Sequence, residues 1–363
     1  MGSLVLDSLA VRGFRTFRSL NIERLARVTL LAGRNGVGKS FVLDAVRFYA
    51  RRGLPGELLD QLAARNELAR LPVVRPRWSD DWRDRAEALR CLFYGWPLLG
   101  ARPSFTVKGS AGDVVVQVVP REDLPGQLAL PLAGDTAGTG DLALGIWADR
   151  PTAVLLDRLF DPRTGARYET GSTDGTRVLT IGAQGLDEER AATLFDAVWL
   201  DHELKEEALR ALSLVHADVE EVNFASSHRP DKARSAEARV RGGGRVSLAA
   251  LGEGAPRLLN IALAMANAAD GLALIDEVDR GLHHSVHADL WGLVLRLAAR
   301  LNVQVVATTH SRDCIDGLAQ ALTSDLEADG LLVRLDRQGD HHQAVTYDRR
   351  RLSIAATDHI EVR

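Results

Sequence analysis

Residues 33–40 read Gly33-Arg34-Asn35-Gly36-Val37-Gly38-Lys39-Ser40. The octapeptide fits the pattern G-x-x-x-x-G-K-[ST], in which a glycine-rich loop binds phosphate. The apolar, β-branched segment Val28–Ala32 before it predicts a strand, and Lys39–Arg51 after it predicts an amphipathic helix. A glycine-rich turn that matches by chance would not be expected between a strand and a helix. The sequence therefore predicts an α/β nucleotide-binding fold built around this loop.

The loop has the chemistry to hold ATP together with Mg²⁺. Its glycines allow backbone angles that are closed to other residues, so loop amides and the helix N-terminus can face the phosphates. Lys39 supplies a positive charge between the β- and γ-phosphates, where it is also catalytic, and Ser40 offers a hydroxyl to Mg²⁺. The predicted nucleotide-binding residues are Gly33, Arg34, Asn35, Gly36, Val37, Gly38, Lys39, Ser40 and Phe41.

Two adjacent carboxylates follow a second predicted strand, Leu272–Ile275. Ligands bind at the carboxyl ends of strands in parallel sheets, so we expect Asp276 and Glu277 near the glycine-rich loop. Asp276 would hold Mg²⁺, and Glu277 would polarise the water that attacks the γ-phosphate. A strand that ends in two solvated acids is the alternative, which the upstream loop disfavours.

A histidine follows a third predicted strand, Gln304–Thr308. Just past the strand tip, His310 can hydrogen-bond the γ-phosphate and respond to its hydrolysis. A purely structural histidine is the alternative. Because the acid pair, a helix and this strand follow the loop in order, we favour a catalytic His310.

The segment Leu251-Gly252-Glu253-Gly254 opens a predicted helix, Pro256–Ala269. Glycines at a helix N-terminus can form an anion site, which makes these four residues candidates for nucleotide binding. An ordinary turn with a helix cap has the same spacing. From this helix onward, strands alternate with helices, which predicts parallel strands joined by crossover helices.

Composition excludes several classes of protein. The 363 residues carry a net charge of −4, which gives no overall attraction to nucleic acid or to an anionic membrane. No apolar run reaches the roughly eighteen residues of a membrane-spanning helix, and the N-terminus lacks a signal-peptide pattern. Cys91 and Cys314 are the only cysteines, so neither a disulfide framework nor a zinc cluster is expected. We expect a reduced, cytoplasmic protein with no membrane partner.

The rest of the chain is less informative. Further predicted elements are the strands Leu4–Val11, Ser104–Lys108, Val114–Val119 and Val219–Phe224 and the helices Leu186–Leu200, Glu203–Val215 and Ser285–Arg300. A basic segment contains Arg229, Lys232, Arg234, Arg239, Arg241 and Arg245. These cations could contact DNA or RNA phosphates, although a solvated hairpin is the reading that we favour.

With these motifs in hand, the chain resembles the ABC-type ATPases grouped with the OLD (overcoming lysogenization defect) family and the heads of structural-maintenance-of-chromosomes proteins. It is similar to short, stand-alone bacterial AAA-type members of that group. The resemblance is carried by Gly13–Phe17, Gly33–Ser40, Ala250–Leu259, Leu274–Ser285 and Gln304–Ser311. It implies an α/β P-loop NTPase fold, that of an ABC-type ATPase head with a mixed α/β insertion. The implied division is an N-terminal lobe (1–51), an insertion or arm (52–185) and a C-terminal lobe (186–363).

The resemblance also implies a mechanism. Two subunits would sandwich two ATP molecules, each P-loop facing the other subunit's signature loop, Leu251–Gly254, with Asp279–His284 lining the seam. Hydrolysis would separate this homodimer and drive a partner in DNA-linked work or in defence against phage. In the OLD family a TOPRIM-type nuclease domain often follows the ATPase. Because this chain ends at Arg363, we expect any such nuclease on a separate protein.

Two other functions use the same loop. In an ATP-locked scaffold or sensor, turnover would be negligible, and comparing hydrolysis by the wild type and Glu277→Gln separates this case from an ATPase. A P-loop kinase for a small metabolite must avoid activating water. The Asp276–Glu277 pair and His310 therefore disfavour the kinase.

Overall fold

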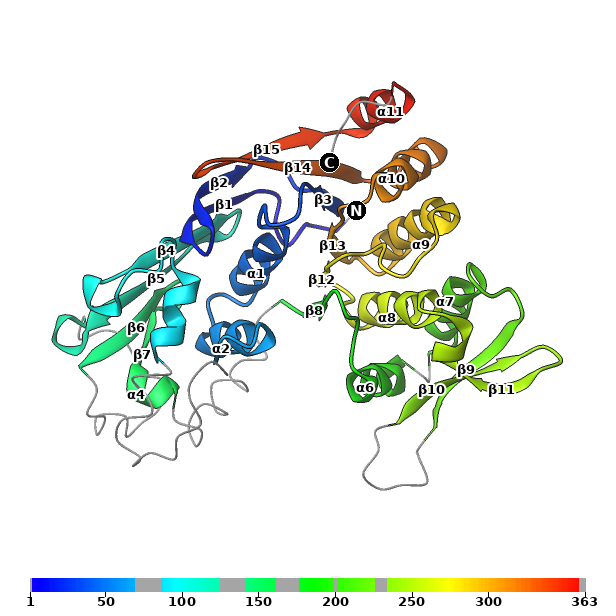
Figure 1. Cartoon of the computed structure of the whole chain (residues 1–363), viewed down its shortest axis with the longest axis horizontal. Helices are drawn as coiled ribbons and strands as arrows, with labels where there is room; N and C mark the ends of the chain where they lie inside the picture. The colour runs from blue at the N-terminus through cyan, green and yellow to red at the C-terminus, as the bar shows by residue number, and fades with distance from the viewer. Residues whose placement is uncertain are drawn as a thin grey trace.

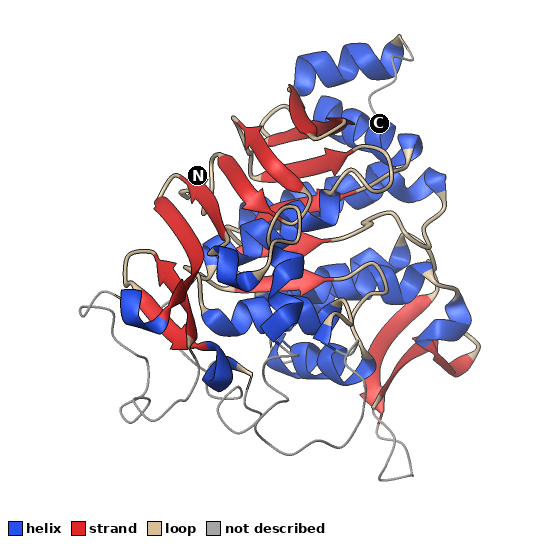
Figure 2. Ribbon diagram, turned by 60° about the vertical axis from the view of Figure 1, so that its left-hand side comes forward, coloured by secondary structure: helices blue, strands red, loops and turns tan. Residues whose placement is uncertain are grey.

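The computed structural model describes residues 2–68, 86–124, 141–160, 176–198, 201–225 and 234–358. In these ranges the strands form three sheets, and helices cover both faces of the central, mostly parallel one (Figures 1 and 2).

The central sheet contains all three strands that the motifs follow. Its order is β15-β14-β3-β13-β12-β8. The strands are β3 (Val28–Ala32), β8 (Val178–Ile181), β12 (Leu272–Ile275), β13 (Gln304–Thr308), β14 (Gly330–Gln338) and β15 (His341–Tyr347). All neighbours pair in parallel except β15, which is antiparallel to β14. The predicted bounds of β3, β12 and β13 are confirmed, and their carboxyl ends meet at one edge.

Alternate residues of these strands enter two hydrophobic cores. Leu30 and Ile275 face the core beneath α8 (Gly254–Asn267), α9 (His287–Arg300) and α10 (Arg312–Ser324). Leu31 and Leu274 face the opposite core, beneath α1 (Lys39–Ala50). Since both faces are covered, the strands are apolar throughout, as is usual for parallel sheets.

A second sheet is antiparallel and packs on the α1 side. Its order is β2-β1-β4-β5-β6-β7. The strands are β1 (Leu9–Phe14), β2 (Phe17–Ile22), β4 (Ser104–Gly109), β5 (Gly112–Pro120), β6 (Leu142–Trp147) and β7 (Thr152–Leu155). Phe105 on β4 packs against Phe48 of α1, with ring centroids 5.6 Å apart, and against Phe14 of β1 within the sheet, with centroids 4.9 Å apart. The short helices α2 (Pro55–Ala64) and α4 (Leu156–Leu159) complete this lobe.

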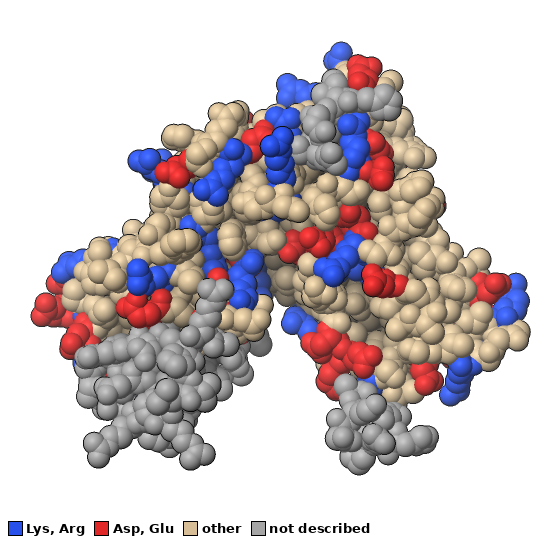
Figure 3. Space-filling model, in the orientation of Figure 1, with Lys and Arg blue, Asp and Glu red and all other residues tan. Residues whose placement is uncertain are grey.

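A third, three-stranded sheet lies on the far side of the central sheet (Figure 1). It comprises β9 (Val219–Ala225), β10 (Ser235–Val240) and β11 (Gly244–Ser247), flanked by α6 (Glu188–Val198) and α7 (His202–Ser213). α11 (Arg349–Thr357) packs near α10 at the top of the figure. A space-filling view shows the notch between the two outer lobes (Figure 3).

Several predicted boundaries differ from those of the structure, and two of the differences have an identifiable cause. β1 begins at Leu9 instead of Leu4, because the backbone of Leu6 is hydrogen-bonded at both its N–H (2.9 Å) and its carbonyl (2.6 Å) by the buried Gln304 amide. α8 begins at Gly254, two residues before the predicted start. Pro256 then falls in the first helical turn, where a missing N–H has no cost.

The predicted three-part division of the chain stays a prediction. Within residues 52–185, β4 pairs with β1 and β8 pairs with β12. The segment therefore contributes strands both to the antiparallel sheet and to the edge of the central sheet.

Candidate active site

The P-loop (Gly33–Ser40) runs from the end of β3 to the start of α1. At two of its glycines, Gly33 and Gly38, neighbouring atoms leave no room for a side chain. A Cβ on Gly33, whose φ is 146°, would lie 2.5 Å from the Leu335 carbonyl oxygen. A Cβ on Gly38, whose φ is 100°, would lie 2.7 Å from the Phe17 ring. Asn35, between them, is exposed at the tip of the loop. The loop is thus fixed at both ends and open in the middle.

The N-terminus of α1 has the features of an anion-binding site. Gly38 caps the helix in a left-handed conformation, and its first turn contains neither an acidic residue nor, among the described residues, a capping side chain. Helix N-termini carry partial positive charge and unpaired N–H groups, which attract phosphate.

Lys39 lies buried inside the loop. Its Nζ donates to the carbonyl oxygens of Gly33 (2.7 Å) and Arg34 (3.2 Å). Burial lowers the pKa of Lys39, and the charges of Asp276, Glu277 and Asp279 oppose that effect. The lysine therefore shares its surroundings with the carboxylates that follow β12.

Ser40 and Asp276 meet directly, although 236 positions separate them in the chain. Ser40 Oγ donates to Asp276 Oδ2 (2.9 Å), and Thr308 Oγ1 donates to Asp276 Oδ1 (2.6 Å). Hydroxyl and carboxylate oxygens fit Mg²⁺, which proteins commonly hold by one or two side chains plus substrate phosphates. The described residues contain no group of three or more histidines, cysteines or carboxylates that could form a metal site by itself.

Glu277 lies between two cationic or titratable side chains. Its carboxylate is 3.5 Å from Arg280 Nη1 and 3.9 Å from His310 Nδ1. Its backbone is left-handed, with a φ of 49°, and its N–H donates to Thr308 Oγ1 (2.8 Å). Positive φ is uncommon outside glycine and is often found at functional sites.

The signature-like loop (Leu251–Gly254) does not join this cluster within the chain. Gly252 and Glu253 are exposed, and Gly252 has a φ of 95°. A Cβ on Gly254 would lie 3.1 Å from both the Gly281 carbonyl oxygen and the Leu282 side chain, in the segment after β12. The role of these four residues in nucleotide binding stays a prediction.

Phe41 has a different environment from the rest of the P-loop. Its ring lies 5.4 Å from the Arg15 guanidinium and 4.6 Å from that of Arg65, and its N–H donates to the Gly38 carbonyl (2.9 Å). Its assignment to the nucleotide stays a prediction.

From the sequence, no site role was assigned to Thr308 or Arg257, and Arg280 was placed only within the segment Asp279–His284 at the dimer seam. The adjacent hydroxyls of Thr308 and Thr309 before His310 are a signal that could have been used, because polar side chains at a strand tip face the ligand edge. Thr309 Oγ1 donates to Asp279 (2.7 Å). Arg257 interrupts an apolar helix, which is a weaker signal.

We expect Thr308→Val to lower the free energy of unfolding by about 1–3 kcal/mol and to weaken Mg-ATP binding. The change removes one of the two hydroxyl donors to Asp276, which keeps Ser40, and it removes the side-chain acceptor of the Glu277 N–H, which is left unpaired. Denaturant unfolding and nucleotide titration measure the two effects.

Thr180→Val is the matched control. Thr180 is paired with Leu274 on the neighbouring strand, and its buried hydroxyl has no hydrogen-bond partner among the described residues. The control should be neutral or stabilising. Equal effects of the two variants would contradict the assigned role of Thr308.

The described part of the basic segment lies in and next to the hairpin β10–β11, and Arg234, Arg239 and Arg241 form ion pairs with acidic side chains. Arg234 pairs with Asp196 (2.8 Å), and Arg241 pairs with Glu220 (3.4 Å). Arg229 and Lys232 lie outside the described residues. On the face in Figure 3, basic and acidic side chains are interspersed.

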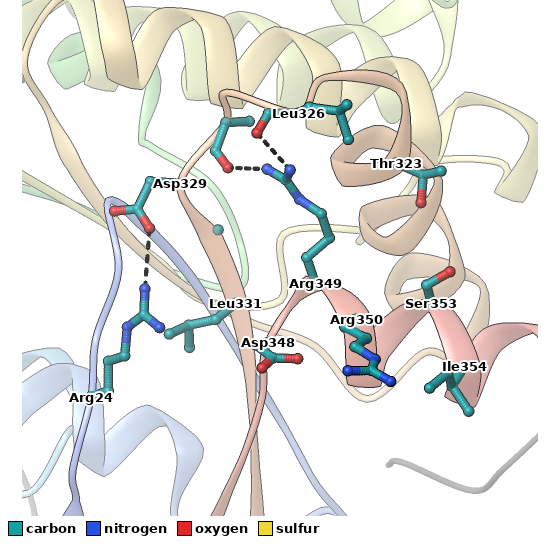
Figure 4. A pocket seen from close by; sticks show the side chains of 12 residues that line it. Arg24, Thr323, Leu326, Asp329, Leu331, Asp348, Arg349, Arg350, Ser353 and Ile354 are labelled. Carbon is teal, nitrogen blue, oxygen red and sulfur yellow. Dashed lines mark hydrogen bonds and ion pairs between the residues drawn. The ribbon is translucent and has the colours of Figure 1, made fainter.

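A cavity of about 640 Å³ lies at the opposite edge of the central sheet (Figure 4). It opens beside Gly330, where β14 begins, whereas the P-loop follows the end of β3. Arg349 crosses it to reach the carbonyl oxygens of Leu326 (2.5 Å) and Ala328 (2.6 Å). Because β14 and β3 are parallel, this cavity is separate from the candidate site. Among the described residues, no helix combines the length and apolar character needed to cross a bilayer.

Comparisons with known proteins agree with this fold. Residues 189–313 match the family described as AAA domain, putative AbiEii toxin, Type IV TA system. That span includes Asp276, Glu277 and His310 but not the P-loop. No curated protein matches the chain.

Among solved structures, the chain is similar to an Smc head bound to the C-winged helix domain of ScpA, with 14% identity, a TM-score of 0.51 and coverage of 94% of this chain and 97% of that one. The SMC head domain from Thermotoga maritima has 15% identity and a TM-score of 0.44, with coverage of 94% and 99%. An Smc head from Pyrococcus furiosus, bound to the C-terminal domain of ScpA, has 14% identity and a TM-score of 0.45, with coverage of 98% and 99%. The predicted α/β fold of an ABC-type ATPase head is confirmed.

Proposed function

We propose that the protein binds ATP with Mg²⁺ and hydrolyses it as a dimer of ABC-type ATPase heads. One observation carries the proposal: Ser40 at the start of α1, Asp276 just after β12 and Thr308 at the end of β13 form a hydrogen-bonded cluster, with Lys39 and Glu277 beside it. These are the groups that phosphoryl transfer to water requires, namely a phosphate cradle, oxygen ligands for Mg²⁺ and a carboxylate base.

The residues would divide the work as follows. The loop amides and Lys39 would bind the β- and γ-phosphates, and Ser40 and Asp276 would hold Mg²⁺, whose charge offsets that of the phosphates. Glu277 would orient a water and accept its proton as the water oxygen attacks the γ-phosphorus. The bond from that phosphorus to the β–γ bridging oxygen would break, leaving ADP and phosphate. His310, 3.9 Å from Glu277, would hydrogen-bond the γ-phosphate.

A second copy would complete the site. In one chain the signature-like loop packs against the segment after β12, and Gly252 and Glu253 remain exposed. An exposed, glycine-containing helix start is suited to bind the γ-phosphate held by another subunit. In this arrangement, ATP hydrolysis requires the association of two subunits.

The test is ATP hydrolysis measured over a range of protein concentrations. We expect activity per subunit to rise with concentration, because a catalytically complete site needs two chains. Activity per subunit that is independent of concentration would contradict the dimer. Equal, near-zero rates for the wild type and Glu277→Gln would favour the ATP-locked scaffold.

The proposal extends to a separate effector that the ATPase cycle drives or gates. The resemblance to the OLD group supports a TOPRIM-type nuclease in DNA-linked or anti-phage work. The Smc head with the similar fold is itself bound to a domain of ScpA. Affinity capture with Glu277→Gln and ATP should retain such an effector, and capture with Lys39→Met should not.

A further inference from the structure

Arg257 is a buried arginine in α8, which runs beside β12 and β8 (Figure 1). Only 5% of its surface is exposed. Its Nη2 donates to the carbonyl oxygens of Asp276 (2.5 Å) and Glu277 (2.8 Å), and its Nη1 donates to that of Gly182 (3.0 Å). One guanidinium therefore joins α8 to the ends of two neighbouring strands.

This position is a costly one for a charged side chain. Burial lowers the pKa of Arg257 to about 10, against the opposing effect of the Asp276, Asp279 and Glu277 charges. Its buried Nε has no hydrogen-bond partner among the described residues. Buried charges are often replaceable by apolar residues without loss of stability, so packing alone does not account for an arginine here.

The contact acts on the backbone of Glu277. The Glu277 N–H donates to Thr308 Oγ1 (2.8 Å), and the Glu277 carbonyl accepts from Arg257 Nη2 (2.8 Å) and from the Arg280 N–H (3.0 Å), at a left-handed φ of 49°. Without one of these partners, a non-glycine residue at positive φ is expected to relax toward a commoner conformation. The carboxylate would then leave its place beside His310.

The same helix carries the signature-like loop. Gly254 opens α8, and a Cβ there would lie 3.1 Å from the Gly281 carbonyl oxygen. The signature-like loop, the first turns of α8 and the backbone of Glu277 are thus in one connected block.

We propose that Arg257 is a positioning residue, which holds Glu277 in its reactive conformation and couples it to the signature-like loop. When a second subunit binds that loop, the coupling orients the Glu277 carboxylate so that it can activate the attacking water. The inference rests on the proposed ATPase function and names the residue that links association to hydrolysis.

The experiment compares Arg257→Lys and Arg257→Met with the wild-type chain. We expect both to lower kcat at least tenfold and to change the Kd for Mg-ATP less than threefold, because Arg257 contacts neither the P-loop nor the metal ligands' side chains. A buried lysine has a lowered pKa, so the kcat of Arg257→Lys should fall further between pH 7 and pH 9. The wild-type kcat should fall less over that range, because its arginine stays charged and only the titration of Lys39, common to both proteins, remains.

Arg27→Lys is the matched control. Arg27 is also buried and donates to the Gly2 carbonyl (2.6 Å) and to Asn302 Oδ1 (2.9 Å), before the start of β3 at the opposite edge of the sheet. The kcat of Arg27→Lys should stay within twofold of the wild-type value at each pH. If the wild type hydrolyses ATP and Arg257→Lys has the same kcat and pH profile, the inference is overturned but the proposed function is not. Absence of turnover in the wild type would overturn the proposed function and the inference with it.

Discussion

Replacement of Glu277 by glutamine is expected to lower kcat for ATP hydrolysis by about 10²–10⁴-fold, the range for loss of a general base. The amide keeps the size of the side chain but accepts no proton from water. Mg-ATP affinity should change little, because Lys39, Ser40 and Asp276 are untouched. Phosphate release and equilibrium nucleotide binding measure the two quantities. Light scattering with ATP should also show that the variant accumulates as a dimer.

Glu221→Gln provides the control for this variant. Glu221 lies on β9 and pairs with Arg239 at 3.4 Å, away from the P-loop. Its kcat should equal that of the wild type. Wild-type turnover by Glu277→Gln would mean that another group takes the proton from water.

Lys39→Met should weaken Mg-ATP binding by about ten- to a hundredfold, the effect of losing about 1.5–3 kcal/mol from a charged hydrogen bond. Methionine has a similar length and no charge. Because burial disfavours the lysine cation, the folded state should tolerate the change. Fluorescence titration with a nucleotide analogue measures the affinity.

The same variant provides a test of pH dependence. Binding needs protonated Lys39, and burial lowers the pKa of this residue below its ordinary value of 10.5. Wild-type affinity should therefore decline as pH rises toward the lowered pKa, and Lys39→Met should lack this decline. Lys108→Met, at an exposed lysine paired with Asp113, is the control and should bind like wild type. An unchanged affinity of Lys39→Met for Mg-ATP would show that Lys39 does not bind the phosphates.

The core of the site was predictable because it depends on local patterns. β3, β12 and β13 are short apolar runs, each followed by polar or glycine residues, so both their bounds and the edge at which they end follow from the sequence. Parallel pairing then brings Asp276 to Ser40. No knowledge of distant contacts was needed for this step.

The unpredicted parts depend on contacts between distant side chains and backbone. Gln304 replaces strand pairing for Leu6, 298 positions away, which no local pattern reveals. Arg257 donates hydrogen bonds to backbone carbonyl groups. Because every residue has such a group, the sequence does not indicate which residues are its partners. The left-handed φ of Glu277 follows from the turn after β12 and could not be read from a glutamate.

The P-loop, Lys39 and the Ser40–Asp276 pair are the groups that we propose to hold ATP with Mg²⁺. Calorimetric titration of the wild-type chain with ATP, in the presence of Mg²⁺ and then of a chelator, measures this directly. We expect one ATP bound per chain and a clear loss of affinity when Mg²⁺ is removed. No binding in either condition, or an affinity indifferent to Mg²⁺, would contradict it.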